Sequence, residues 1–212
     1  MQWILDNRTL IWQRTLQHLW IALPPIVLSF ILSVPVGWLA NRFQRIRALL
    51  LGGLGLLYAV PSLPLFIALP GILGTGLRDP KNVIVALVIY GVALMARATT
   101  EGLQSVDSEI RQAGTALGFS RWSRFWKVEL PLAGPVMLAG IRVVAVSTVS
   151  LTTVGAVLGI KSLGSLFTDG TQRNIPEEIV AGIAITMLMA LIIDALLVLV
   201  GRLLMPWTPS NP

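Results

Sequence analysis

The sequence predicts an all-α, polytopic membrane protein with about five transmembrane helices. Hydrophobic residues make up 55% of the 212-residue chain and charged residues only 12%, whereas soluble domains carry about 25% charged residues. A chain this apolar has too little polar surface to face water on every side. Five apolar segments are long enough, or nearly so, to cross a hydrocarbon core of about 30 Å. We therefore expect a single transmembrane domain over residues 1–212, without a soluble domain.

The expected spans cover about residues 19–40, 48–70, 82–96, 132–158 and 179–204. The third span is short, but Lys81 and Arg97 at its ends can extend their charged groups toward the lipid headgroups. Residues 1–18 are too polar for a cleaved signal peptide and lack a small-residue cleavage site. They are expected instead to form a helix on the membrane surface, whose apolar face holds Trp3, Leu10, Ile11, Leu16 and Leu19. His18 is expected to be an interfacial residue rather than a ligand.

The net charge of +6 is distributed unevenly between alternate loops, which predicts the orientation of the chain. One set of loops carries Arg42, Arg45, Arg47, Arg97, Arg111, Arg121, Arg124, Lys127 and Arg202. The opposite set mixes basic residues with Asp6, Asp79, Asp169, Glu177 and Glu178. Because Lys and Arg are enriched in short cytoplasmic loops, we expect the N-terminus outside and the C-terminus in the cytoplasm, together with residues 105–131. Basic residues scattered between apolar spans do not indicate a nucleic-acid partner.

Prolines interrupt the second span near its middle, at Pro61 and Pro64. A proline lacks the amide donor and clashes with the preceding helical turn. Backbone groups freed inside a bilayer need protein or a water-filled cavity around them, and broken helices at the midplane often line transport paths. The fourth span adds hydroxyl side chains, which either bond between packed helices or line a polar cavity. The candidate path residues are Tyr58, Pro61, Ser62, Pro64, Ser147 and Ser150; the alternative is a packing kink and hydroxyls that serve helix packing.

Arg142 and Asp194 are the two ionisable residues that lie well inside expected spans. Charges inside a membrane are costly and are usually paired or functional. Arg142 follows Pro131 by about 16 Å of helix, and Asp194 precedes Arg202 by about 12 Å. These similar depths predict a structural ion pair between the fourth and fifth spans, with direct contact to a substrate as the alternative.

Residues 105–131 are polar and helix-forming although they lie between two long apolar runs. Asp107 is a good N-cap with Glu109 in the first turn, and Gly118 is a natural C′ residue. Ser120 is expected to cap a second short helix that Pro131 ends. Aromatic and basic residues are interleaved at helical spacing in this second helix. The segment either docks a soluble partner or rests as an amphipathic helix on the inner leaflet.

The run QAGTALGFSRWSRFWKVELP, residues 112–131, resembles the "EAA" signature of the permease subunits of bacterial ABC importers. Gln112, Ala113 and Gly114 stand where that pattern has Glu-Ala-Ala, Gly118 supplies its glycine, and the pattern's terminal Leu-Pro is present. In that family the segment is the coupling helix, which sits in a groove of the ATPase subunit. The resemblance implies an ABC importer permease fold with these ATPase-coupling residues: Gln112, Ala113, Gly114, Gly118, Arg121, Trp122, Arg124, Leu130 and Pro131.

Four other segments, residues 59–66, 121–142, 163–174 and 192–197, resemble the permeases of glycine betaine, carnitine and choline importers. This resemblance implies ATP-driven import of a small quaternary-ammonium or zwitterionic solute across a prokaryotic plasma membrane. It also implies three protein partners: ABC ATPase subunits, a second permease chain of the same or a sister type, and an extracytoplasmic substrate-binding protein. Permeases for methionine and other small solutes share much of the pattern, so another solute such as an amino acid stays an alternative.

The sequence gives no indication of an enzyme. It has no glycine-rich phosphate loop of the form GxxxxGK[ST], no cysteine, and no visible nucleophile–base pair or metal cluster. We therefore expect no cofactor in this chain, and ATP and Mg²⁺ bound by the partner ATPase. An ATPase-independent channel or carrier would leave the polar segment 105–131 unexplained, and a membrane scaffold without transport would leave the broken second span unexplained.

Overall fold

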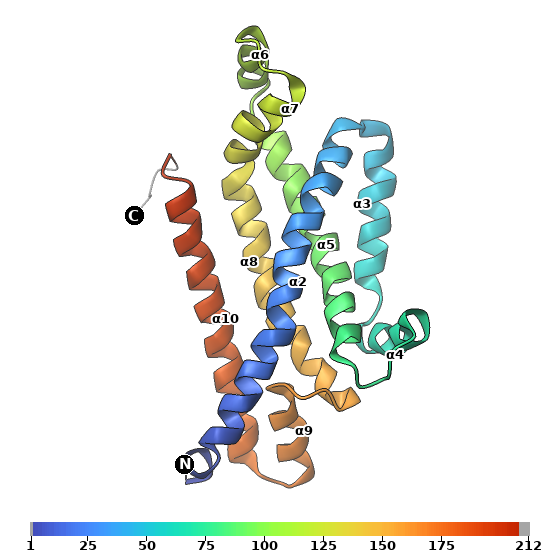
Figure 1. Ribbon diagram of the computed structural model, residues 1–212, viewed down its shortest axis with the longest axis vertical. Coiled ribbons are helices and arrows are strands. Elements are labelled where there is room, and N and C mark those ends of the chain that lie inside the picture. Colours follow the sequence, from blue (N-terminus) through green and yellow to red (C-terminus); the bar gives the residue numbers. More distant parts are fainter. Residues whose placement is uncertain (1, 208–212) are drawn as a thin grey trace.

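The computed structural model describes residues 2–207, which are helical with short connections and contain no strand (Figure 1). The helices follow in the order α1 (Gln2–Asp6), α2 (Arg8–Arg42), α3 (Gln44–Ala59), α4 (Ser62–Leu73), α5 (Pro80–Ser105), α6 (Ser108–Ala116), α7 (Arg121–Arg124), the π-helical turn η1 (Phe125–Glu129), α8 (Leu130–Val154), the 3-10 turn η2 (Gly155–Leu158), α9 (Gly164–Gln172) and α10 (Pro176–Leu204).

Four helical stretches in the described chain are long and apolar enough to cross a membrane: Arg8–Arg42, Pro80–Ser105, Arg121–Leu158 and Pro176–Leu204. A fifth crossing is possible for the pair α3 and α4, which are bent by 101° at their junction. The prediction of an all-α polytopic membrane protein is therefore confirmed. In Figure 1 the N-terminus and α9 lie at one end of the bundle, and α6 and α7 lie at the other.

Helix α2 packs closely against α5 because small side chains face each other at the crossing. A β-carbon added to Gly91 would lie 2.6 Å from Ser29 Cβ, and one added to Gly37 would lie 2.6 Å from Thr99 Cβ. Ser33 Oγ and Thr99 Oγ1 are 3.3 Å apart and share a hydrogen bond between the helices. Small residues that let backbones approach, reinforced by hydroxyl bonds, are the usual means of packing helices in lipid, where burial of apolar surface adds little.

The expected surface helix over residues 1–18 is wrong, because α2 begins at Arg8 and continues through the first span without a break. Leu10 and Leu19 pack against the core of the bundle. His18 is fully buried, and its Nε2 donates to the Val149 carbonyl of α8 at 3.1 Å. The interfacial placement of His18 is therefore also wrong: its imidazole finds an acceptor inside the bundle, which fixes this part of α2 against α8.

The third span is longer than expected, because α5 runs to Ser105 and not to residue 96. Arg97 consequently lies within the helix, with an exposed side chain, and not at its end. Beyond residue 96 the helix continues through polar residues, of which Thr100 is buried and donates its hydroxyl to the Ala96 carbonyl at 2.7 Å. Because the Thr100 hydroxyl bonds to the backbone of its own helix, this polar residue does not end the helix.

Pro131 does not end the helix that Ser120 begins, contrary to expectation, since Arg121–Leu158 is one continuous helical stretch. The stretch passes through the π-helical turn η1, in which the Leu130 amide donates to the Phe125 carbonyl five residues back. A proline lacks an amide donor and its ring clashes with a carbonyl four residues before it. The wider turn just before Pro131 accommodates both defects, and the chain continues into α8.

The predicted break in the second span is present, but the two halves diverge more than a kink implies. Helix α3 ends at Ala59 and α4 begins at Ser62, at an angle of 101°. Tyr90 of α5 donates its hydroxyl to the Val60 carbonyl at 2.7 Å, which satisfies an acceptor at the break. Tyr90 lies ten residues into α5, or about 15 Å from the start of that helix.

Candidate functional site

The segment of residues 105–131 forms a compact helical projection, α6 and α7, beyond the ends of the long helices (Figure 1). Both of its predicted N-caps are confirmed. Asp107 Oδ1 accepts from the Glu109 amide at 2.9 Å, and Ser120 Oγ accepts from the Ser123 amide at 3.2 Å. Each bond satisfies an amide that the first helical turn leaves free.

Gly118 ends α6 as expected, in the left-handed conformation with φ of +82°. The Phe119 amide donates to the Gly114 carbonyl at 3.1 Å, and the Gly118 amide donates to the Thr115 carbonyl at 3.0 Å. These two bonds form a Schellman motif, which requires a left-handed residue at C′. The glycine therefore sets the angle at which the chain turns from α6 toward α7.

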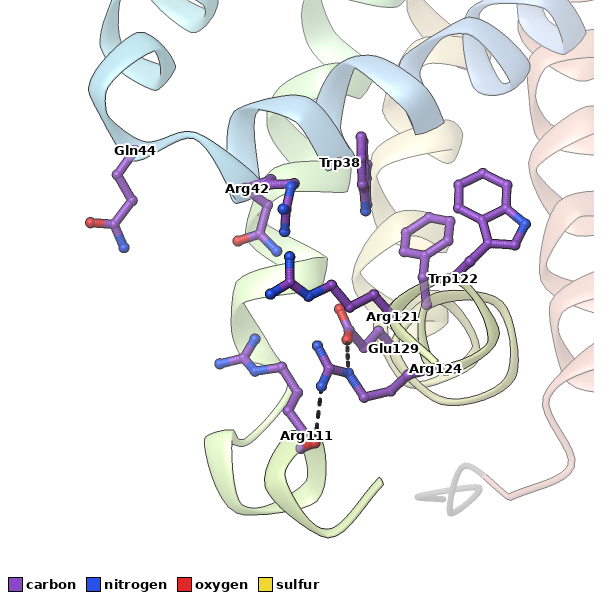
Figure 2. A pocket seen from close by; sticks show the side chains of 10 residues that line it. Trp38, Arg42, Gln44, Arg111, Arg121, Trp122, Arg124 and Glu129 are labelled. Carbon is purple, nitrogen blue, oxygen red and sulfur yellow. Dashed lines mark hydrogen bonds and ion pairs between the residues drawn. The ribbon is translucent and has the colours of Figure 1, made fainter. Parts of the chain in front are cut away.

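Arg124 holds the two helices of the projection together (Figure 2). Its Nε donates to Glu129 Oε1 at 2.6 Å, and its Nη1 donates to Thr115 Oγ1 at 2.5 Å and to the Arg111 carbonyl at 3.3 Å. The residue Glu129 is 7% exposed, so this ion pair is largely withdrawn from solvent. One guanidinium thus joins α6 to the end of η1, which continues into α8.

Gly114 replaces an alanine of the resembled pattern, and the structure gives a reason. Gly114 is buried beneath the stem of Arg124, and a β-carbon there would lie 3.2 Å from Arg124 Cδ and 3.3 Å from Cγ. Such contacts are tighter than most in proteins, so an alanine would displace the arginine stem. Glycine at this position lets Arg124 reach Thr115 and Glu129.

The other predicted coupling residues divide into an exposed group and a group at the base of the projection. Gln112, Ala113, Arg121 and Trp122 are exposed, and Trp122 retains 63% of its accessible surface. Leu130 and Pro131, by contrast, are half-buried at the start of α8. The exposed group therefore lies on the surface of the projection, whereas Gly114 and Arg124 lie beneath it and the exposed Gly118 sets its turn.

Arg142 and Asp194, which the sequence suggested as a pair, are brought together between α8 and α10. Arg142 Nε donates to Asp194 Oδ1 at 2.6 Å, and Nη2 donates to Oδ2 at 2.8 Å. The two parallel bonds form a bidentate pair, the geometry that a planar guanidinium and a carboxylate favour. Arg142 lies about 18 Å along α8 from Leu130, deep within the stretch that crosses the membrane.

The candidate path residues lie on separate helices. Tyr58 and Pro61 are exposed and Ser62 half-buried at the α3–α4 break, where the Tyr58 ring meets the Tyr90 ring edge-on at 5.7 Å between centroids. Pro64 is exposed in the first turn of α4. Ser150 is exposed on α8 and Ser147 half-buried. Within residues 2–207 no hydrogen bond joins the candidate residues at the α3–α4 break to Ser147 or Ser150 of α8. One chain therefore does not assemble them into a single polar site.

Sequence comparison places the chain in a family. Residues 33–208 match the family described as the inner membrane component of binding-protein-dependent transport systems, and the chain belongs to that family. It is 31% identical to the osmoprotectant import permease protein OsmW of Salmonella typhimurium, over 100% of this chain and 98% of that protein. It is also 31% identical to the glycine betaine/carnitine/choline permease protein OpuCB of Bacillus subtilis, over 91% of this chain and 88% of that protein.

Solved structures show the same fold. The methionine ABC transporter MetNI, in an inward-facing form, contains a chain that matches with a TM-score of 0.78 and 18% identity, over 96% of this chain and 99% of the other. A chain of an amino acid ABC transporter with histidines matches with a TM-score of 0.77 and 17% identity, over 94% and 96%. The protein is therefore a multi-pass inner-membrane permease subunit of an ABC transporter, and not an enzyme.

The sequence alone missed three residues of the projection: Glu129, Thr115 and the carbonyl of Arg111, all of which bind Arg124. The pair Arg124 and Glu129 is separated by five residues, whereas side chains of an α-helix meet at a spacing of three or four. Only the π-helical turn brings a spacing of five onto one face. The proline after that turn was the one signal in the sequence that the helix is irregular there.

Proposed function

We propose that this permease imports a compatible solute such as glycine betaine, choline or carnitine, and that residues 112–131 couple it to a separate ATPase. The observation that carries the proposal is the projection itself: a capped, internally bonded helical unit that stands clear of the apolar helices (Figure 1). A membrane protein gains little from such a polar unit unless a soluble partner binds it. The family resemblance of this run supports the ATPase as that partner.

Contact with the ATPase falls to the exposed residues of the projection, Gln112, Ala113, Arg121 and Trp122. Arg124 acts beneath them by keeping α6 and η1 at a fixed angle through Glu129 and Thr115. A rigid projection can transmit a displacement of the ATPase to α8, because η1 continues directly into that helix. ATP and Mg²⁺ bind to the ATPase, whose closure moves the projection and alternates the access of the path.

The chain is oriented with its N-terminus outside and its C-terminus in the cytoplasm. Supporting this, the loop that holds Arg42, Arg45 and Arg47 lies at the same end of the bundle as α6 and α7 (Figure 1). The opposite end, near the N-terminus and α9, mixes basic with acidic residues. Excess basic charge marks the cytoplasmic side. The projection then faces the ATPase, and the α9 end faces an extracytoplasmic substrate-binding protein.

The solute class follows from the relatives, whose names specify osmoprotectants, glycine betaine, carnitine and choline. These solutes carry a quaternary ammonium group, which aromatic ring faces attract. The ring of Tyr58 at the α3–α4 break, which meets the buried ring of Tyr90 edge-on, supplies such a face. Tyr58 is 42% exposed, so its ring is available to a passing solute.

The path forms between two permease chains. Helix α3 has no buried residue in this single chain, and β-carbons added to its Gly52, Gly53 or Gly55 would meet nothing within 4 Å. An apolar helix with an uncovered face of small residues is suited to close packing against another helix in lipid. A second copy or a sister permease covers this face, which places the candidate residues of α3, α4 and α8 around a common path.

Uptake of labelled glycine betaine tests the proposal in cells that lack their own betaine importers. The chain is expressed with its binding protein and ATPase, beside a hydrolysis-dead ATPase as control. Accumulation that requires an active ATPase is the expected result. An intact complex that accumulates labelled choline or carnitine instead would narrow the solute within the proposed class, and one that accumulates only an amino acid would keep the importer and correct the solute. Accumulation with the inactive ATPase would point to a channel or carrier and contradict the proposal.

A further inference from the structure

A basic pocket lies where the C-terminal end of α2 meets the base of the projection (Figure 2). Its volume is about 470 Å³, and it is lined by Trp38, Asn41, Arg42, Gln44, Arg111, Arg121, Trp122, Arg124, Phe125 and Glu129. The lining comes from two parts of the chain that are distant in sequence: the junction of α2 with α3, and the stretch from α6 to η1. The pocket is therefore a product of the tertiary fold.

The charges in this pocket do not balance. Four arginines and one glutamate line it, and the single carboxylate, Glu129, is bound to Arg124. Among residues 2–207 no other carboxylate lies within ion-pairing distance of Arg42, Arg111 or Arg121. Figure 2 shows these three side chains reaching into a shared space from three segments. Like charges held together repel one another unless an anion lies between them.

The pocket is preformed in part. Arg124 is fixed by bonds to Glu129, Thr115 and the Arg111 carbonyl. Arg111 is anchored in turn, because its Nη1 donates to the Leu103 carbonyl at 3.3 Å. The Arg42 guanidinium rests 6.0 Å from the ring centre of Trp38 and 5.6 Å from that of Phe43. Guanidinium groups held in place bind phosphate oxygens through paired hydrogen bonds without much further ordering.

We propose that this pocket binds the phosphate group of an anionic phospholipid. Phosphate suits the arginine lining, and the surroundings indicate a lipid as its source. Trp126 and Phe43, beside the pocket, are each 47% exposed. Exposed aromatic rings are typical of the headgroup layer, and basic pockets between transmembrane helices bind anionic lipid headgroups. The bound lipid joins α2 to the projection. This site goes beyond the proposed transport function, and it shares Arg121 and Trp122 with the proposed ATPase contact, so the test includes added ATPase.

Lipid binding is measured by native mass spectrometry of the full chain in a zwitterionic detergent, titrated with phosphatidylglycerol and, separately, phosphatidylcholine. The double variant Arg42→Gln with Arg121→Gln removes two unpaired charges from the pocket. The matched control, Arg45→Gln with Arg202→Gln, removes two charges that lie outside the pocket lining. Wild type and control should retain phosphatidylglycerol in preference to phosphatidylcholine. Each arginine lost from the pocket should weaken retention roughly fivefold, the effect of about 1 kcal/mol per basic residue at a membrane surface.

Three further measurements complete the test: a variant that keeps the charge, competition by inorganic phosphate, and addition of the ATPase. The variant Arg42→Lys with Arg121→Lys keeps the charge and should retain most of the binding, which separates loss of the site from loss of the fold. Inorganic phosphate at millimolar concentration should not displace the lipid; displacement would show a free-anion site and overturn the proposal. Equal losses in the pocket variant and the control would show general surface attraction and overturn it too. If the added ATPase binds through Arg42 and Arg121, and the wild-type permease does not prefer phosphatidylglycerol to phosphatidylcholine, the pocket belongs to the protein partner and the proposal is overturned.

Discussion

Gly118→Ala is expected to loosen the projection without creating any clash. A β-carbon at this position would meet no atom within 4 Å, so the effect comes from the backbone alone. The residue must hold φ near +82°, a conformation that costs a residue with a β-carbon about 1–2 kcal/mol. Both bonds of the Schellman motif depend on that conformation. We therefore expect the local free energy of opening at residues 114–119 to fall by about 1–2 kcal/mol.

Hydrogen exchange of the reconstituted permease measures this change. Peptides that cover residues 108–124 should exchange about 5 to 30 times faster in Gly118→Ala than in wild type, because 1.4 kcal/mol corresponds to a factor of ten. Gly118→Asn is the matched control at the same site, since asparagine tolerates the left-handed conformation, and it should exchange less than about threefold faster by the same relation. Equal exchange in wild type and the alanine variant, or equal acceleration by alanine and asparagine, would refute the reasoning.

Three further perturbations test the packing of the long helices. Removal of either charge from the Arg142–Asp194 pair should lower the yield of monodisperse protein; an exchange of the two side chains that restores neither yield nor uptake would argue against the pairing. Gly164→Ala should destabilise the chain by about 3 kcal/mol in thermal unfolding, because its β-carbon collides with the backbone of α8, whereas Gly71→Ala meets nothing within 4 Å and should change little. Tyr90→Phe leaves a carbonyl at the α3–α4 break without its donor and should cost about 1–2 kcal/mol; an unchanged Tm would contradict that role.

The features that the sequence predicted well depend on local chemistry. The apolar length of each span decides whether it can cross a bilayer, and Asp107, Gly118 and Ser120 end or begin helices through bonds to their immediate neighbours. The pairing of Arg142 with Asp194 could be predicted from the sequence for a different reason. A charge inside lipid needs a partner at the same depth, and the chain offers few choices.

The helix boundaries were wrong where distant contacts stabilise polar turns. His18 is held by a carbonyl of α8, 131 residues away in sequence, so residues that looked interfacial belong to the bundle. Thr99 bonds Ser33 of α2, and this contact, like the burial of Thr100, extends α5 past its expected end. A single sequence carries no record of such partners. The ion pair of Arg124 with Glu129 escaped prediction for the related reason that it needs the π-helical turn.

A single introduced cysteine tests whether the projection docks an ATPase. The chain has no cysteine of its own, so Ala113→Cys gives one reactive thiol, at an exposed position of α6. A short reagent that links this thiol to lysine should yield a covalent adduct with the ATPase in the purified complex. Gly76→Cys, exposed in the connection between α4 and α5, is the matched control and should yield none. Absence of the adduct at position 113, or an equal adduct from position 76, would contradict coupling through residues 112–131.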